Sequence, residues 1–253
     1  MNGRNDLKAR IDDLSPMAVR FVARLVNSLA NAPTSNAVAE TWLAGHPEWI
    51  EYFGLALSAH HGTTIEPLGL KGFEAVFRNA CEALDWPVDP PGAATQRFVD
   101  VGLTAADGVR RRLSLKSTAA KGLSERVAVI SKLTEAAWIQ DVRSARTRRQ
   151  RTLELFRDYR AAIDAILMLR AFRDDPAEVP GRYQLIEIPA DIFRALEDLP
   201  VAAFAADGPA VPCAYGGLES AARVALDRSD AKITVRSIQI RACTVHAEWH
   251  LAR

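Results

Sequence analysis

Two alternating runs, "RFVDVGL" and "VRRRLSLKST", constrain the fold of this chain more than any other feature, because they flank the short segment "TAADG" at residues 104–108. In each run, apolar residues recur at every second position over part of the segment, which is typical of a β-strand with one buried face. The segment between the runs favours a turn. The sequence therefore predicts a β-hairpin over residues 97–118.

One face of this hairpin carries two charged residues. Because side chains alternate along a strand, a hairpin that turns symmetrically on "TAADG" pairs Leu103 with Val109 and places Asp100 and Lys116 on the same face. In this register Asp100 lies opposite Arg112, and Lys116 is about 13 Å further along at roughly 3.3 Å per residue.

A shared site for Asp100 and Lys116 requires a different register. Two groups that act on one metal-bound phosphate must lie much closer together than the symmetric hairpin allows. A bulge or an offset would bring them together, and a glycine such as Gly102 or Gly108 would permit it.

The helix expected before the hairpin, "LKGFEAVFRNACEALDW", carries a third notable residue, Glu74. Apolar residues lie at helical spacing from it, at positions 70, 77 and 81. A carboxylate in such a place is costly unless it is paired, hydrogen-bonded or near a metal. Taken singly, Glu74, Asp100 and Lys116 also fit ordinary structural roles: an ion pair at a helix edge, a strand border and a lysine that reaches solvent.

The remaining patterns predict a mixed α/β layer architecture. Residues 1–60 are expected to form an all-helical N-terminal subdomain, and residues 61–253 the core with C-terminal strands. After the hairpin, the pattern predicts a strand at "RVAVIS", one very long helix over 132–172, a strand at "RYQLIEIP", a short helix at "ADIFRALEDL", a loop at "FAADGPAVPCAYGG" and one or two strands in the tail.

Composition excludes several classes of protein. The chain is 49% apolar and 25% charged, which is ordinary for a globular protein. It has no apolar run of about 18 residues, so no transmembrane helix is expected. Its start, "MNGRNDLKARIDDLSP", lacks the apolar stretch of a secretion signal, and its three cysteines are scattered, which indicates the reducing cytoplasm. No phosphate-binding glycine loop indicates a nucleotide-driven enzyme.

Basic residues concentrate in the middle of the chain. Residues 97–160 hold 15 Lys or Arg and 7 Asp or Glu, so this third carries about +8 (15 − 7) within a chain of net charge +1. A local basic zone on a neutral protein is typical of a protein that binds a phosphate backbone. A solvated helix face with nearby acidic partners gives the same pattern.

The order helix Glu, strand Asp, strand xLK and basic helix is the pattern of the PD-(D/E)xK nucleases. Within that superfamily the chain resembles the SmaI-type restriction endonucleases. The segments that carry the resemblance span roughly residues 55–250 in the same order: "HHGTTIEPLGLKGFE", "RRLSLKSTAAKGL", "VISKL", "YQLIEIP" and "IQIRACTVHAEW". It implies a restriction-endonuclease-like mixed sheet flanked by helices.

The resemblance also implies a function. It implies a type II restriction endonuclease that hydrolyses both strands of double-stranded DNA at a short palindromic, GC-rich site. Such an enzyme depends on Mg²⁺, works as a homodimer and has a cognate DNA methyltransferase in the same cell. Asp100 would be a metal ligand, Lys116 the lysine of the xLK element, and Glu74 the second metal ligand. Ser114 stands where the general nuclease motif has an acid, and would at most hold a metal-bound water.

Further residues are candidates for DNA contacts. Arg110, Arg112, Lys121 and Lys132 are plausible phosphate contacts, which position DNA without reading its sequence. A non-cleaving DNA-binding or assembly protein, with its site decayed at Ser114, is the alternative function. Ser–Lys nucleophilic catalysis at Ser114 and Lys116 lacks an identifiable oxyanion hole. The adjacent histidines 60 and 61 point too far apart to chelate one metal easily, so a turn-forming or DNA-contacting role fits them better. The late-strand histidine 246 fits a buried structural role.

Overall fold

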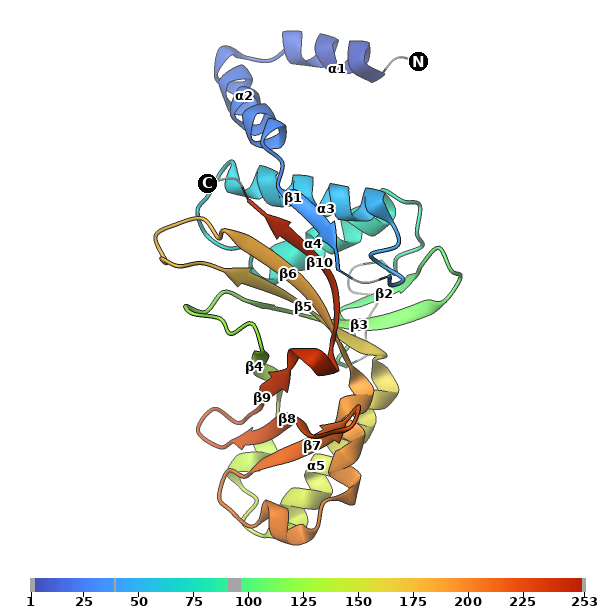
Figure 1. Cartoon of the computed structure of the whole chain (residues 1–253), viewed down its shortest axis with the longest axis vertical. Helices are drawn as coiled ribbons and strands as arrows, with labels where there is room; N and C mark the ends of the chain where they lie inside the picture. The colour runs from blue at the N-terminus through green and yellow to red at the C-terminus, as the bar shows by residue number, and fades with distance from the viewer. Residues whose placement is uncertain (1–2, 39, 91–96, 252–253) are drawn as a thin grey trace.

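A computed structural model describes residues 3–38, 40–90 and 97–251 (Figure 1). Its larger sheet has six strands: β1 (Thr34–Ala37), β2 (Val101–Thr104), β3 (Arg110–Thr118), β5 (Ala165–Phe172), β6 (Arg182–Pro189) and β10 (Thr244–His250). Their order is β1-β10-β6-β5-β3-β2, with β3 and β5 parallel and the other neighbours antiparallel. Strand β5, "AILMLRAF", is buried along almost its whole length, because it lies inside the sheet with both faces covered.

A second, four-stranded antiparallel sheet has the order β4-β9-β8-β7. Its strands are β4 (Val127–Glu135), β7 (Ala210–Tyr215), β8 (Leu218–Asp227) and β9 (Lys232–Gln239). Strands β7 and β8 are joined by Gly216 and Gly217, whose φ angles are 57° and 79°. Two positive φ values at a two-residue hairpin loop favour glycine, so this turn is specified locally.

Helices α3 (Pro47–His61) and α4 (Leu70–Glu82) share one hydrophobic core with the larger sheet. Aromatic side chains dominate this core: Phe53 of α3 lies 4.8 Å from Trp249 of β10 and 6.0 Å from Phe73 of α4, measured between ring centroids. Leu115 of β3 and Leu167 of β5 belong to the same core. The odd-numbered residues of β3 and β5 therefore face α3 and α4.

Helix α5 (Ala145–Ala162) belongs to a second core, which also includes residues of both sheets. Ile166 and Met168 of β5 contribute to it, so β5 supplies alternate side chains to two different cores. Four 3₁₀ segments complete the description: η1 (Ala137–Gln140), η2 (Ala190–Asp198), η3 (Val201–Phe204) and η4 (Ile240–Ala242). The even-numbered face of β3, which includes Ser114, is the one that faces this second core.

The N-terminal helices α1 (Gly3–Asp12) and α2 (Pro16–Ala30) lie outside both cores and extend beyond the larger sheet in Figure 1. Ser15 caps α2 by accepting a hydrogen bond from the Ala18 amide at 3.2 Å. Several apolar side chains of α2 are exposed, including Met17 at 70% and Phe21 at 56%. Among the described residues, no helix combines the length and the apolar character that crossing a membrane requires.

The mixed α/β prediction is confirmed, but two element assignments are wrong. The long helix predicted over 132–172 is the end of β4, then η1, α5 and β5. A continuous apolar run such as "AILMLRAF" fits a buried strand as well as a helix, and parallel pairing with β3 decides between them. The predicted loop over 204–217 contains β7, and "LESAARVALD" forms β8 because antiparallel neighbours pair with it on both sides.

The expected all-helical character of residues 1–60 is also wrong. Thr34–Ala37 form β1, which pairs with β10 at the edge of the larger sheet. Helix α3 shares its core with residues far along the chain, whereas α2 has no buried side chain. The strands predicted at "RVAVIS" and "RYQLIEIP" are confirmed as β4 and β6, and the tail forms two strands rather than one.

We expect the same substitution to have very different effects in α2 and α3. Phe53→Ala removes a fully buried ring and should lower the free energy of unfolding by about 3–5 kcal/mol. Phe21→Ala, at an exposed ring, should change it by no more than about 0.5 kcal/mol. Urea denaturation of both variants measures the difference, and equal effects would contradict the division of the chain into core and peripheral helices.

Candidate functional site

The hairpin between β2 and β3 has a register offset from the symmetric one. Val101 pairs with Leu113 and Thr104 with Arg110, so Asp100 stands opposite Ser114 rather than Arg112. The offset arises because Gly108 adopts a φ of 73°, which lets the chain turn within residues 106–108. The predicted register is therefore wrong by two residues, while the shared face for Asp100 and Lys116 is kept.

This register brings Asp100, Ser114 and Lys116 into contact. Ser114 Oγ donates to Asp100 Oδ2 at 3.1 Å, and the Leu115 amide donates to the same oxygen at 2.7 Å. Lys116 Nζ donates to Ser114 Oγ at 2.9 Å and to the Leu115 carbonyl at 3.0 Å, and it lies 3.6 Å from Asp100 Oδ2. Three of the residues predicted for the site thus form one hydrogen-bonded group.

The hydrogen-bonded group of Asp100, Ser114 and Lys116 is partly shielded from solvent. Ser114 is 1% exposed, whereas the side chains of Asp100 and Lys116 are 31% and 17% exposed. Strand β2 begins only at Val101, so β3 has no β2 partner beyond Ser114. The Leu115 amide, which a paired strand would otherwise accept from, instead donates its hydrogen bond to the Asp100 carboxylate. Among the described residues, the hydrogen bonds to the Asp100 carboxylate all go to Oδ2, which leaves Oδ1 as an acceptor.

Tyr159 of α5 lies against this group. Burial raises the pKa of Tyr159, the nearby Ser114 hydroxyl lowers it and the Asp100 charge raises it. The Tyr159 hydroxyl approaches Ser114 but has no hydrogen-bond partner of ordinary geometry among the described residues. Its ring packs on Phe98 at 4.9 Å between centroids. No sequence pattern pointed to Tyr159, because α5 was not separated from the strand that follows it.

Two arginines hold the backbone around the site. Arg78 of α4 donates to the Asp100 carbonyl and to the Asp89 carbonyl, both at 2.6 Å. Arg112 of β3 donates to Asp164 Oδ1 at 2.8 Å and to the Ala161 carbonyl at 2.7 Å, and its amide donates to Asp164 Oδ2 at 2.7 Å. Asp164 directly precedes β5, so this contact fixes β3 along its parallel neighbour.

Glu74 lies outside the hydrogen-bonded group. It forms an ion pair with Lys71 at 3.0 Å, and its side chain is 19% exposed. Helix positions four apart share a face, so Leu70, Glu74 and Arg78 form one stripe of α4. Leu70 at one end lines the same cavity as Lys116, and Arg78 at the other end bonds the Asp100 carbonyl. Glu74 lies between these two residues, but α4 covers the odd-numbered face of β3, whereas Asp100, Ser114 and Lys116 lie on the even-numbered face.

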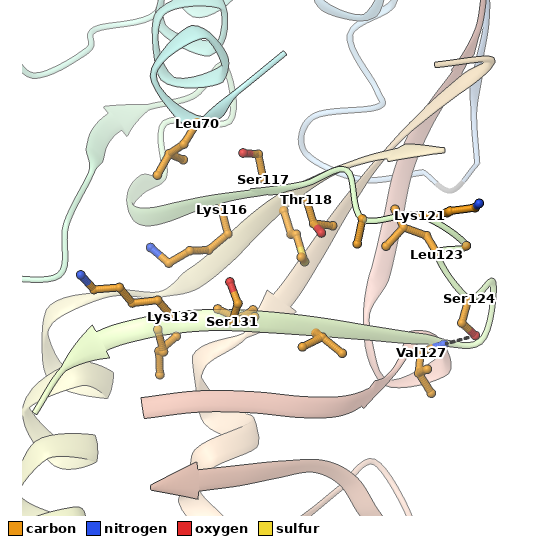
Figure 2. Close-up of a pocket in the computed structure, with 16 residues that line it drawn as sticks. Leu70, Lys116, Ser117, Thr118, Lys121, Leu123, Ser124, Val127, Ser131 and Lys132 are labelled. Carbon is orange, nitrogen blue, oxygen red and sulfur yellow. Dashed lines mark hydrogen bonds between the residues drawn. The ribbon is translucent and has the colours of Figure 1, made fainter. Parts of the chain in front are cut away.

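A cavity of about 840 Å³ separates β3 of the larger sheet from β4 of the smaller one (Figure 2). Lys116, Lys121 and Lys132 line it, together with hydroxyl residues and apolar residues of β3, β4 and the loop between them. Figure 2 shows the side chains of Lys116 and Lys132 extending in the same direction from the two strands. Three predicted lysines therefore line one cavity, but Figure 2 shows Lys121 at the opposite end from Lys116 and Lys132, and Lys132 is also paired with Glu135 at 2.7 Å.

The two arginines predicted to contact phosphate have protein partners. Arg110 pairs with Asp89 at 2.6 Å, and its side chain remains 57% exposed. Arg112 is held by Asp164 as described above, so most of its donors serve the fold. Their DNA contacts stay predictions, and Arg112 is the weaker candidate because binding phosphate would break the β3–β5 anchor.

The histidines have structural partners, as expected. His246 is fully buried, with Nδ1 2.6 Å from Thr41 Oγ1 and Nε2 3.0 Å from Glu187 Oε2. Burial opposes the ionisation of Glu187, but hydrogen bonds from His246 and Trp42 lower its pKa below the ordinary value. His61 bonds the Tyr183 hydroxyl at 2.9 Å, and burial lowers its pKa to about 4.

The oxygen atoms of the site suit a hard cation. Mg²⁺ prefers carboxylate and water oxygens in octahedral geometry. Asp100 offers Oδ1 for this purpose, whereas the Glu74 carboxylate pairs with Lys71 and lies outside the hydrogen-bonded group. The described residues contain no group of three or more His, Cys, Asp or Glu side chains placed to bind a metal. A cation here would therefore rely on few protein ligands and on water.

Comparison of the chain with protein-family models, with curated proteins and with solved structures finds no match. The assignment of a function therefore depends on the geometry of the site.

We expect the Arg112–Asp164 anchor to depend on pH. Burial opposes the ionisation of Asp164, but the hydrogen bonds and charge of Arg112 outweigh it and lower the pKa of this carboxyl. A carboxyl with a lowered folded-state pKa stabilises the fold above its unfolded pKa of about 4, and this contribution is lost as the pH falls through the folded-state value. Asp164→Asn should therefore lower the free energy of unfolding at pH 7, and the difference from wild type should shrink below about pH 4.

Denaturation from pH 2 to pH 8 measures this difference. Asp158→Asn, on the exposed face of the neighbouring helix α5, is the matched control and should leave the unfolding free energy within about 0.5 kcal/mol. A constant difference for Asp164→Asn across the whole range would show that Asp164 acts only through packing.

Proposed function

We propose that this protein is a Mg²⁺-dependent endonuclease that hydrolyses double-stranded DNA, with a restriction-endonuclease-like core and a variant site in which Ser114 replaces an acid. The observation that carries the proposal is the contact among Asp100, Ser114 and Lys116 at the open edge of β3. A carboxylate and a lysine that lie 3.6 Å apart are groups that phosphodiester hydrolysis can use.

Each residue has a role in the proposed reaction. Asp100, through Oδ1, and Glu74 would hold the metal, and Glu74 must exchange Lys71 for it. Mg²⁺ bound there supplies Lewis-acid stabilisation of the negative charge that develops on the phosphate. Lys116 orients the attacking water and offsets charge on the phosphate. Ser114 fixes the Asp100 carboxylate by donating to Oδ2, which keeps Oδ1 turned outward.

DNA binding in this proposal uses the cavity between the sheets. Lys121 and Lys132 line the same cavity as Lys116, so phosphates on either side of the scissile one would meet ammonium groups. Such contacts provide affinity and position without reading sequence. The enzyme would act as a homodimer, because a twofold pair of sites meets the two strands of a palindrome identically.

The first test is cleavage of supercoiled plasmid with Mg²⁺, with and without EDTA. Asp100→Asn and Lys116→Met should each lower the cleavage rate by about 10²–10⁴-fold, because each removes a group that acts on the reacting phosphate. DNA affinity should remain measurable in both variants. Lys8→Met, on the peripheral helix α1, is the matched control and should cut at the wild-type rate.

Discrete EDTA-sensitive fragments support the endonuclease, and sequencing their ends gives the recognition site. Wild-type cleavage by either Asp100→Asn or Lys116→Met would show that the site is wrongly assigned. Glu74→Gln distinguishes a second ligand from a structural residue: a ligand raises the Mg²⁺ concentration needed for half-maximal rate, whereas a structural residue changes stability alone.

The alternative is a DNA-binding or assembly protein without cleavage. The observation that favours it is Ser114, because a hydroxyl replaces the acid that the nuclease motif has at this position. Retardation of DNA without cutting, under the same conditions, would decide for this alternative.

A second prediction concerns the cavity lysines. Lys121→Ala and Lys132→Ala should each weaken DNA binding for all sequences alike, and each should reduce the slope of log K against log salt by about one. Fluorescence anisotropy from 50 to 300 mM salt would measure both quantities. Lys232→Ala, on β9 and paired with Asp230, is the control and should leave the slope unchanged. An unchanged slope for both cavity variants would place the DNA elsewhere.

A further inference from the structure

The Tyr159 hydroxyl is a buried polar group that makes no well-formed hydrogen bond with the described residues in the resting structure. Tyr159 is 1% exposed, and its hydroxyl, which lies near the Ser114 hydroxyl, forms no hydrogen bond of ordinary geometry among the described residues. Leaving a buried hydroxyl unpaired costs about 1–3 kcal/mol relative to a paired one. Phenylalanine would fill the same space without this cost. An unpaired hydroxyl at this position therefore suggests that it is needed in another state of the site.

Packing holds Tyr159 against the Asp100–Ser114 pair. Its ring contacts Phe98 at 4.9 Å and Phe193 at 5.9 Å between centroids, so it is enclosed by aromatic side chains. Phe98 lies two residues before Asp100 and has a φ of 79°, which is strained for a bulky residue. The hydroxyl faces Ser114, and the Asp100 charge lies close enough to influence it. The chain thus keeps a strained backbone beside an unpaired hydroxyl next to the site.

In the proposed reaction, Ser114 Oγ would lose the hydrogen bond that it accepts from Lys116. In the resting structure Ser114 donates to Asp100 and accepts from Lys116. When the Lys116 ammonium swings toward a phosphate or a water, its hydrogen bond to Ser114 is broken. Ser114 Oγ would then lack a donor while almost completely buried. The Tyr159 hydroxyl lies beside Ser114 and is a donor without a partner of ordinary geometry in the described part of the chain.

We propose that Tyr159 is a positioning residue that replaces Lys116 as the hydrogen-bond donor to Ser114 when Lys116 turns to the substrate. Because Tyr159 then donates to Ser114 Oγ, breaking the Lys116–Ser114 hydrogen bond costs less free energy. The Ser114–Asp100 hydrogen bond stays in place. This role in turnover rests on the proposed function, but the exchange of donors is a property of the fold and is testable without DNA.

The test without DNA compares Tyr159→Phe in two backgrounds. In the wild-type background the hydroxyl is unpaired, so Tyr159→Phe should leave the folding equilibrium constant unchanged or raise it. In the Lys116→Met background Ser114 has lost its donor and accepts from Tyr159, so Tyr159→Phe should lower that constant by roughly two- to twelvefold. Urea denaturation of the wild type, both single variants and the double variant gives the comparison. Equal effects in the two backgrounds would overturn the proposed exchange.

The test in turnover uses Tyr159→Phe and Ser114→Ala. Tyr159→Phe should lower kcat by about tenfold with KM and DNA affinity unchanged, because the lysine is released less readily. In the Ser114→Ala background the same change should cost nothing further, because the acceptor is gone. A loss of affinity, or additive losses in the double variant, would instead indicate a general packing role and overturn the inference.

The two tests separate the two proposals. If the wild-type protein binds DNA but does not cut it, the endonuclease fails, and the stability comparison still decides the donor exchange. If the protein cuts DNA and the stability comparison shows equal effects, the endonuclease stands and the role of Tyr159 fails.

Discussion

The position of β3 along its two neighbours is the constraint on which the rest of the site depends. On one side, a turn at residues 106–108 sets the pairing with β2, because Gly108 adopts a positive φ. On the other side, Arg112 and Asp164 fix β3 against the start of β5. Together they place Asp100 opposite Ser114. A slip of one residue would turn Lys116 to the opposite face, and the symmetric register would separate it from Asp100 by about 13 Å.

The local chemistry explains why a serine suits position 114. Ser114 is almost fully buried beside Asp100, so a second carboxylate at that position would place two negative charges together out of water, which is costly without a bound cation. Serine instead donates to Asp100 and accepts from Lys116, so its hydroxyl acts both as a donor and as an acceptor in the resting state. The side chain at position 114 therefore adds no second carboxylate to this group, and α4, which carries Glu74, covers the opposite, odd-numbered face of β3.

The arrangement of the two sheets determines where the basic residues in the middle of the chain lie. Lys116, Lys121 and Lys132 come from β3, the loop after it and β4, and the separation of those strands into different sheets opens the cavity they line. Arg170 of β5 is fully buried and donates to the Ser124 and Val127 carbonyls. These hydrogen bonds hold the end of the β3–β4 loop at one side of this cavity. By contrast, Arg110 and Arg112 are engaged in ion pairs, so charge density in the sequence does not identify which basic residues are available.

The sequence by itself determined the strands at β3, β4 and β6, the shared face of Asp100 and Lys116, and the buried role of His246, because period-two alternation and apolar neighbours are local signals. It did not determine the register of the hairpin, which depends on the φ of one glycine. Nor did it separate α5 from β5, because a continuous apolar run fits both, or reveal β8, whose alanine-rich sequence becomes a strand only between two antiparallel partners. Only the tertiary structure placed Tyr159 beside Ser114, since contacts between residues 45 positions apart leave no periodic trace in the chain.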